Sequence, residues 1–465
     1  MLGVVWGGMP MHNTEDTPSC LEVVEESKPT QKNESDKQKH LRFAKLLLAK
    51  LGKENVVFHV GCFWLWRNAL WEKADDRELK KAIHEIAKAE KLTKSFVDSV
   101  LDLAKTEAFR FGHEFDPDRS GINVSNGTLH WIDSNWVLRP HRREDYRTTM
   151  LPVAYDETAT APRFLKFLDE IFAYDEDGED KKRLVLEAIG YSMTTSTEYE
   201  KFFMLAGDGS NGKSVLLYVL RALVGKKNTS AVQPSQFDNR FQRAHMHGKL
   251  ANIITELPKG SELHDAATKA IVSGEATTVE HKHKDPFDVE LFTTLWIGTN
   301  HIPTTNDFSD ALFRRAIIIP FTRQFSLEER DVKLKYKLAA LELSGILNLA
   351  LDAYGGVIQR GGFTVPDSVE EAINNWKSEN DPVRGFACDC IEEDRNATGE
   401  AATLSADYYR AFVTFCEEEG VPRIPKQKAF TVRLCKVTAG TSGRSNKGRT
   451  IEGIRLITEN QDDED

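Results

Sequence analysis

The chain has 465 residues, of which 40% are hydrophobic and 29% charged, and its formal net charge is −11 at pH 7. This length is enough for roughly two to four domains. No apolar run approaches a membrane span, and the six cysteines lack metal-ligand spacing, so we expect a cytoplasmic protein with reduced thiols and no membrane partner. The acidic balance does not exclude nucleic-acid binding, which depends on a local basic surface.

The amino-terminal part of the sequence alternates helix and strand patterns. Residues 1–40 are polar, acidic and poor in apolar periodicity, and we expect them to form a disordered leader. Apolar spacing along 41–51 then predicts a helix that ends before Gly52. The next segments predict two aromatic strands, helices and a hairpin with an Asn-Gly turn, at 56–60, 62–66, roughly 76–108 and 122–132.

Two acidic clusters precede the middle of the chain. Asp116 and Asp118 flank a proline, and because no adjacent strand pattern supports a metal site, we interpret them as part of a turn. The acidic run at 175–180 is interpreted as a solvated loop. A helix over roughly 181–195 is expected to lead from this loop into the next strand.

The most informative stretch is a glycine-rich turn between an apolar strand pattern and an apolar helix pattern. Its spacing, GxxxxGKS, is typical of a phosphate-binding loop. Glycines can take positive φ and turn backbone N–H groups toward a phosphate. Lys213 would then reach the β- and γ-phosphates of ATP, and Ser214 would bind Mg²⁺. The predicted nucleotide-binding residues are Gly207, Asp208, Gly209, Ser210, Asn211, Gly212, Lys213 and Ser214.

Two later strand patterns end in polar residues suited to ATP hydrolysis. The strand pattern that begins at Leu250 ends at Glu256, our candidate for activating the attacking water and for binding Mg²⁺. A surface acid is the alternative for this residue. The next such pattern ends at Asn300, which is suited to positioning the same water, although an asparagine that merely starts a turn has the same pattern.

Basic residues accompany these strands at two places. Arg314 and Arg315 lead into a buried strand pattern, where one of them would act as an arginine finger on the γ-phosphate of a neighbouring subunit. A strand-edge salt bridge is the alternative. Lys282, His283 and Lys284 are expected at an exposed hairpin tip, where they would contact DNA phosphates or simply remain solvated.

The carboxyl-terminal region combines helix patterns, basic residues and a final hairpin pattern. That order is typical of a winged-helix domain, with a recognition helix near 426–435 and a wing at 443–449. A solvated basic face is the alternative, but basic clustering in an acidic chain favours DNA binding. The predicted DNA contacts in this region are Lys426, Lys428, Arg433, Arg444, Lys447 and Arg449.

Taken in order, these motifs resemble superfamily 3 helicases, specifically the helicase part of phage, plasmid and poxvirus-type primase-helicases. The resemblance rests on 207–214, Glu256-Leu257, 269–275 with the basic hairpin, 299–303 and Phe313-Arg314-Arg315. It implies an AAA+-like homo-oligomeric ring, a hexamer, that hydrolyses ATP between subunits. It also implies single-stranded DNA in the ring channel, with duplex DNA at the winged helix as a further candidate, and it assigns the finger to Arg315 with Arg314 beside it.

The expected fold class is α/β, and the resemblance orders the domains along the chain. They are a disordered leader at 1–40, an α+β amino-terminal helicase-associated domain at 41–195, a P-loop ATPase core at 196–365, a winged helix at 366–458 and an acidic tail at 459–465. Many relatives carry two adjacent acids where Thr255 precedes Glu256 here, so Mg²⁺ binding would depend more on Ser214 and water.

The predicted function is an ATP-dependent DNA helicase that replicates a phage or plasmid-like mobile element. No catalytic acid set of a primase is found, which makes a separate primase a candidate partner. A non-translocating, ATP-controlled DNA-binding replication initiator is the alternative. A small-molecule P-loop kinase is disfavoured by the paired arginines and the basic carboxyl-terminal region.

Overall fold

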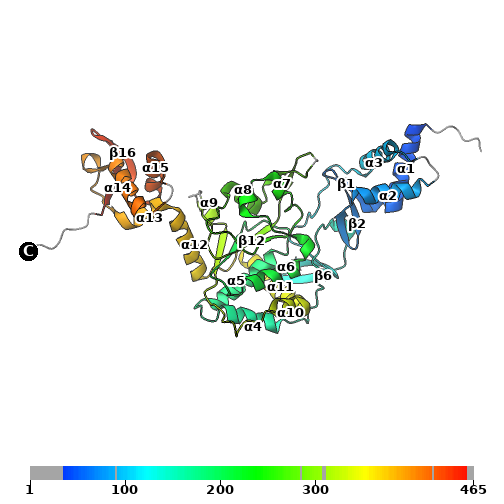
Figure 1. Ribbon diagram of the computed structural model, residues 1–465, viewed down its shortest axis with the longest axis horizontal. Helices are drawn as coiled ribbons and strands as arrows, with labels where there is room; N and C mark the ends of the chain where they lie inside the picture. Colours follow the sequence, from blue (N-terminus) through cyan, green and yellow to red (C-terminus); the bar gives the residue numbers. More distant parts are fainter. Residues whose placement is uncertain (1–34, 89–91, 283–284, 306–309, 422–423, 458–465) are drawn as a thin grey trace, which may run out of the picture. The chain divides into compact units, whose positions relative to one another are not determined.

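The computed structural model describes residues 35–88, 92–282, 285–305, 310–421 and 424–457 (Figure 1). These residues form two compact units. One contains the residues up to 53 together with 75–108, and the other contains 54–74 together with the chain from 109 onward. Because the second unit holds the glycine-rich turn and the later strands, it carries most of the candidate site.

The first unit is a bundle of helices. Its helices are α1 (Asp36–Leu51), α2 (Asp76–Ile86) and α3 (Lys94–Ala108). Ser35 and Gln38 form a capping box, in which each side chain bonds the other residue's backbone, so α1 begins at Asp36 rather than near residue 41. The last residues of the predicted leader are therefore helical, whereas the rest of the leader lies outside the described residues.

Two antiparallel sheets begin the second unit. One contains β1 (Val56–His59), β2 (Cys62–Arg67) and β3 (Leu70–Lys73), and the other contains β4 (Ile122–Val124), β5 (Gly127–Ile132) and β6 (Asn135–Arg139). The predicted hairpin is confirmed, but Val124 pairs with Gly127, so its two turn residues are 125–126. The Asn126 amide exchanges two hydrogen bonds of 2.9 Å with the backbone of Tyr155, which fixes the following segment to this turn.

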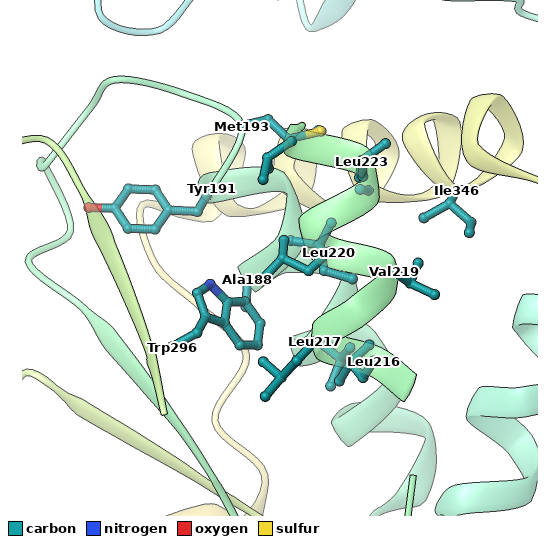
Figure 2. Packing of buried hydrophobic residues seen from close by; sticks show 14 of the residues in the cluster. Ala188, Tyr191, Met193, Leu216, Leu217, Val219, Leu220, Leu223, Trp296 and Ile346 are labelled. Carbon is teal, nitrogen blue, oxygen red and sulfur yellow. The ribbon is translucent and has the colours of Figure 1, made fainter. Parts of the chain in front are cut away.

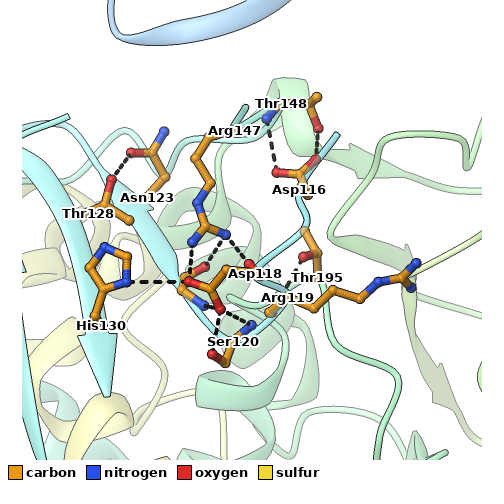
Figure 3. Close-up of polar contacts among 11 residues, drawn as sticks. Asp116, Asp118, Arg119, Ser120, Asn123, Thr128, His130, Arg147, Thr148 and Thr195 are labelled. Carbon is orange, nitrogen blue, oxygen red and sulfur yellow. Dashed lines mark hydrogen bonds and ion pairs between the residues drawn. The ribbon is translucent and has the colours of Figure 1, made fainter. Parts of the chain in front are cut away.

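The Asp116–Asp118 segment is a turn, as predicted, but its carboxylates are structural (Figure 3). Asp116 has a φ of 51°, and its buried carboxylate accepts hydrogen bonds from the backbone and hydroxyl of Thr148. Burial raises the pKa of this carboxyl group. Asp118 pairs with the buried guanidinium of Arg147 at 2.6 Å. The turn is thereby fixed to the segment at 147–148.

The centre of the second unit is a five-stranded, all-parallel sheet, so the chain is a mixed α/β protein. Its order is β13-β7-β12-β9-β8. Residues on both faces are buried, as the mostly apolar strand sequences predict for parallel strands. The strands are β7 (Phe202–Ala206), β8 (Thr229–Ser230), β9 (Ala251–Ile254), β12 (Thr294–Thr299) and β13 (Ala316–Pro320).

Alternate side chains of β7 enter two separate cores. Phe203 and Leu205 join one cluster, and Phe202 and Met204 join another, because successive side chains of a strand point to opposite faces. The helices contributing to the first cluster are α4 (Pro162–Ile171), α5 (Gly178–Tyr191), α6 (Lys213–Val224), α10 (Leu334–Leu341) and α11 (Leu343–Arg360). Those contributing to the second are α8 (Asp265–Ser273), α9 (Asp310–Phe313) and α12 (Asp367–Asn380), and α12 also contributes Val369 to the first.

Figure 2 shows the first cluster, where α6 packs toward the sheet through Leu216, Leu217 and Leu220. Trp296 stacks on Phe203 with ring centroids 4.8 Å apart, and its indole N–H donates a 2.8 Å hydrogen bond to Ser192 just beyond α5. Since α4 and α5 share this core with the sheet, the predicted domain boundary at 195/196 marks no break in packing.

The acidic run at 175–180 is not a solvated loop throughout, and this expectation was wrong in part. The Lys181 ammonium is 1% exposed and lies 3.0 Å from the Asp175 carboxylate and 3.7 Å from that of Asp177. It also donates a 3.4 Å hydrogen bond to the carbonyl of Pro320 at the end of β13. Buried carboxylates are retained here because a buried cation pairs with them, and α5 consequently begins at Gly178.

We expect Lys181→Met to lower the free energy of unfolding by about 3–5 kcal/mol, because two largely buried carboxylates would lose their cation. Lys182→Met is the matched control. Its partners Asp169 and Glu179 are 60% and 85% exposed, so we expect a loss of no more than about 1 kcal/mol. Chemical denaturation of the full chain measures both, and equal losses in the two variants would contradict the structural role of Lys181.

The carboxyl-terminal part of the second unit has a core of its own around Phe386, Tyr408, Phe412 and Phe430. The helix patterns expected in the carboxyl-terminal region are confirmed, and they include α12, α13 and α14. The elements after α12 are α13 (Pro382–Cys390), β14 (Ile391–Glu393), β15 (Thr403–Leu404), α14 (Ser405–Glu418), α15 (Gln427–Val437), β16 (Thr441–Ser445), β17 (Gly448–Glu452) and β18 (Ile454–Leu456).

The remaining elements are short. The 3₁₀ helices are Lys53–Asn55, Arg143–Asp145, Lys226–Asn228, Pro234–Gln236 and Gly399–Ala401, and the remaining α-helix and strands are α7 (Arg240–Arg243), β10 (Ala276–Val279) and β11 (Phe287–Glu290). In the part of the chain that the structure describes, no single helix is long and apolar enough to cross a membrane. By length and composition alone, α10 and α11 pass that test as a pair bent by 81°.

Candidate functional site

The glycine-rich turn connects β7 to α6 at the carboxyl-terminal edge of the parallel sheet. Gly207 and Gly212 have φ values of 150° and 92°. A Cβ would lie 2.3 Å from the Phe321 carbonyl oxygen at Gly207, and 2.7 Å from the Ile171 side chain at Gly212. Both positions therefore require glycine. Gly209 does not, because a Cβ there would meet no described atom within 4 Å.

Lys213, the first residue of α6, directs its ammonium back into this turn. The ammonium donates hydrogen bonds to the carbonyls of Gly207 and Asp208, the latter at 2.9 Å, and to the Asn211 amide oxygen at 3.1 Å. These acceptors carry no charge, and burial lowers the pKa of Lys213. A buried cation among neutral oxygens gains most from an anionic partner, so this position is suited to a phosphate.

Asn300 lies beside this ammonium. Its side-chain oxygen is 3.3 Å from the Lys213 ammonium, because Thr299 at the end of β12 is paired with Ala206 at the end of β7. The structure thus brings together two residues that are separated by 87 positions in the sequence. An exposed amide next to the lysine is well placed to position a water molecule at a bound phosphate.

The two predicted metal ligands lie at the same edge of the sheet. Ser214 is exposed at the start of α6. Ile254 of β9 pairs with Ile297 of β12, so the exposed Glu256, two residues further on, is level with Thr299. A hydroxyl and a carboxylate are the hard oxygen ligands that Mg²⁺ prefers, so the residues present fit that ion.

Arg314 and Arg315 lie at the other end of the parallel strands, next to their amino termini. Ala316 pairs with Phe202, the first residue of β7, so both arginines are about 16 Å from Gly207 at 3.3 Å per strand residue. Arg315 is buried, and its guanidinium pairs with Glu200 at 2.6 Å and donates hydrogen bonds to Ser273. Arg314 is exposed. The geometry therefore favours Arg314, rather than the predicted Arg315, for a contact with another subunit.

The predicted basic hairpin is present as β10 and β11, in antiparallel pairing. Lys282 is exposed near its tip, whereas His283 and Lys284 lie outside the described residues. The hairpin is held in place near both of its ends. Arg240 pairs at 2.7 Å with Glu280, which follows β10 toward the tip, and Arg119 pairs at 2.6 Å with Glu290 at the base.

A partly buried imidazole packs against the tip end of this hairpin. The ring of His247 lies beside that of Phe287, which pairs with Val279 next to the tip, with ring centroids 5.7 Å apart. Burial, reinforced by the nearby charge of Lys73, lowers the pKa of His247 to about 3, so the ring packs as a neutral group at physiological pH. The hairpin is thus anchored to the same unit that carries the glycine-rich turn.

The carboxyl-terminal basic residues fall into two groups. Five of the six predicted DNA contacts are exposed, on α15 and its preceding residue or on the β16–β17 hairpin: Lys426, Lys428, Arg444, Lys447 and Arg449. Arg433 differs, because its guanidinium contacts the fully buried carboxylate of Asp381 at 2.5 and 2.9 Å. Arg433 therefore neutralises a buried charge, and its contact with DNA stays a prediction.

Sequence reasoning missed an aromatic and cationic stack beside the glycine-rich turn. The guanidinium of Arg323 lies 5.4 Å from the Tyr174 ring and 4.4 Å from the Phe325 ring. The backbone N–H of Phe325 donates a 2.9 Å hydrogen bond to Ser210 in the turn. The sequence order could have predicted this neighbourhood. Because β13 and β7 are parallel neighbours, the residues that follow β13 must lie near those that follow β7.

Two family models match parts of the chain. Residues 44–173 match the model described as D5 N terminal like, and residues 205–315 match a family of unknown function, DUF5906. The second match begins in β7 and ends at Arg315, so it spans the glycine-rich turn and Asn300. Neither match covers half of the chain.

Solved structures that resemble the chain are described as the NrS-1 C terminal region. The apo structure of residues 305–718 is 12% identical, with a TM-score of 0.49, and the match covers 90% of this chain and 99% of that one. An A form apo structure of that region is 12% identical with a TM-score of 0.47, and covers 89% and 98%.

Curated relatives of the chain are found among large viruses. "Putative helicase L207/L206" of Acanthamoeba polyphaga mimivirus is 22% identical over 222 residues, or 44% of this chain. "Putative helicase 121R" of Invertebrate iridescent virus 3 is 22% identical over 275 residues, or 55% of this chain. The matches cover 20% and 28% of those proteins. The chain is thus similar, over part of their lengths, to viral proteins that carry helicase names.

Proposed function

We propose that the chain is an ATP-dependent DNA helicase of the superfamily 3 type, used in the replication of a viral or mobile-element genome. The observation that carries this proposal is the Lys213 ammonium, enclosed by the glycine-rich turn and adjacent to Asn300 at the carboxyl-terminal edge of a parallel sheet. Nucleotides bind at this edge in open α/β sheets. The helicase names of the viral relatives support the choice of reaction.

In the proposed site, the turn and Lys213 hold the phosphates of ATP, and the amino terminus of α6 adds its positive dipole end. Ser214 and Glu256 would bind Mg²⁺, which neutralises charge on the phosphates when it is present. Glu256 accepts a proton from the attacking water, and Asn300 positions that water. The water oxygen bonds to the γ-phosphorus as the bond from that phosphorus to the β,γ-bridging oxygen breaks, so ADP and phosphate leave with no covalent intermediate on the chain.

We propose an AAA+-like ring, a hexamer, because each chain supplies the two halves of the site at opposite edges of its sheet. An arginine about 16 Å from its own glycine-rich turn cannot complete that site, but it can complete the site of a neighbour. The exposed Arg314 is the proposed finger, and the buried Arg315 holds its segment through Glu200. Single-stranded DNA would lie in the channel against Lys282.

We further propose that the carboxyl-terminal region is a winged helix that contacts DNA. The order of α13, α14 and α15 followed by the β16–β17 hairpin supports this assignment, as do the exposed basic residues on α15 and the hairpin. α15 would be the recognition helix and the hairpin turn the wing. A separate primase remains a proposed partner of this chain.

The test of the proposed function is the rate of ATP hydrolysis with and without single-stranded DNA. We expect DNA to raise the rate for the native chain, and Lys282→Ala to reduce that stimulation while leaving the DNA-free rate unchanged. Lys335→Ala, a change on α10 away from the hairpin, is the matched control. A native rate that is indifferent to DNA would contradict a translocating helicase.

A further inference from the structure

A cavity of about 280 Å³ is lined by residues of α9, α12, α13 and α15. Four of its lining side chains are cations, Lys377, Arg384, Arg433 and Lys436, and they come from α12, α13 and α15. The volume is sufficient for a phosphate group with the sugar attached to it. None of these residues belongs to the nucleotide site, and the cavity therefore needs a separate explanation.

Two of the four cations are already neutralised. Lys377 pairs with Asp310, and Arg433 pairs with the buried Asp381, which also caps α13 by accepting a 3.3 Å hydrogen bond from the backbone N–H of Arg384. Among the described residues, Arg384 and Lys436 form no ion pair. The cavity thus carries an excess of two positive charges.

The positive charge of the cavity also acts on Asp310, the acid in its wall. The hydrogen bond from Lys377 lowers the pKa of Asp310, and the charges of Arg433 and Arg384 lower it further. These guanidinium groups therefore act on the space inside the cavity as well as on their own partners. An anion entering this space would meet the same favourable field.

The cavity adjoins the exposed face of α15. Lys428, Val432 and Lys436 follow one another at intervals of four residues, so they lie along one side of the helix, and all three are exposed. Lys436 is thus part of that face and part of the cavity wall. A DNA strand that follows α15 would bring a backbone phosphate to the cavity.

We propose that this cavity binds a backbone phosphate of DNA, held by Arg384 and Lys436. The guanidinium of Arg384 offers two parallel N–H donors to phosphate oxygens, and Lys436 adds a point charge. This inference rests on the proposed DNA binding of the carboxyl-terminal region. It extends the contact surface from α15 to α13, beyond the recognition helix and the wing.

Equilibrium binding of labelled duplex and single-stranded DNA by the full chain, followed by fluorescence anisotropy over a range of NaCl concentrations, tests the proposal. Each phosphate contact contributes about 0.9 to the slope of log K against log salt concentration for duplex DNA. Because the cavity would hold one phosphate, we expect the double variant to reduce that slope by about 1, and Arg384→Gln and Lys436→Gln each to reduce it by no more than that.

Arg455→Gln is the matched control, because Arg455 is an exposed cation of the same region whose Nε pairs with Glu392 at 2.6 Å on β14. We expect it to retain the native slope. ATP hydrolysis without DNA should be unchanged in all variants, which shows that they are folded. Lys436 is exposed, so Lys436→Gln keeps the test meaningful if the change at Arg384 disturbs α13.

Three outcomes would overturn the inference. If the double variant keeps the native slope, the cavity does not contact DNA. Inorganic phosphate that raises the melting temperature of the native chain but not of the double variant, with an unchanged DNA slope, assigns the cavity to a small free anion. A native chain that binds no DNA refutes this inference and the helicase proposal together, whereas the first two outcomes leave the helicase proposal standing.

Discussion

Lys213→Ala is expected to reduce ATP hydrolysis by about 10²-fold or more while leaving the fold intact. Removing one preorganised charged donor from the γ-phosphate typically has an effect of this size. The ammonium now occupies the turn by bonding to neutral carbonyl and amide oxygens, so its loss leaves no unpaired carboxylate behind. Steady-state hydrolysis and the unfolding midpoint, measured on the same preparation, separate the catalytic loss from a structural one.

Lys249→Ala is the matched control for this change. Lys249 is also a lysine whose pKa is lowered by burial and whose ammonium bonds a backbone carbonyl, that of Lys227. It precedes β9, however, at the sheet edge opposite the glycine-rich turn. We expect near-native hydrolysis for this variant. A Lys213→Ala chain that hydrolyses ATP as fast as the Lys249→Ala chain would refute the nucleotide site.

Arg314→Ala is expected to lower hydrolysis by about 10³-fold, which is the lower end of the effect of an arginine finger. Arg314 is exposed at the edge of the sheet away from its own nucleotide site, so the loss should occur only in assembled chains. Arg315→Ala should instead lower the free energy of unfolding by about 2 kcal/mol, because Glu200 and Ser273 lose their partner.

Mixing two inactive chains shows whether Arg314 acts between subunits. Lys213→Ala retains the arginine, and Arg314→Ala retains the lysine, so a mixed ring contains some sites in which both are present. We expect hydrolysis to rise well above the level of either variant alone. Failure of every mixture to exceed the single variants, at concentrations where the native chain assembles, would place the site within one chain.

Much of the sheet could be predicted because parallel strands bury both faces. The strands β7, β9, β12 and β13 are mostly apolar, and the residues that follow three of them include Lys213, Glu256 and Asn300. β8, with two residues, carries no such signal. The boundaries of α1 and α5 were misplaced because a capping box and a buried lysine extend these helices into polar sequence.

The sequence could not show which charged side chains are buried. Arg314 and Arg315 are adjacent and chemically identical, yet one is exposed and the other pairs with Glu200 in the interior. Arg433 belongs to a basic cluster in the sequence but neutralises Asp381, which lies 52 residues earlier. Such pairings depend on tertiary contacts between distant segments, and residue type and spacing do not encode them locally.

Strand displacement from a forked DNA duplex tests the central claim most directly. We predict that the native chain separates the strands only when ATP and Mg²⁺ are supplied, and that Lys213→Ala binds the same fork without separating it. Binding of the fork and hydrolysis of ATP by the native chain, with the duplex left intact, would contradict a helicase and would instead favour an ATP-controlled DNA-binding replication initiator.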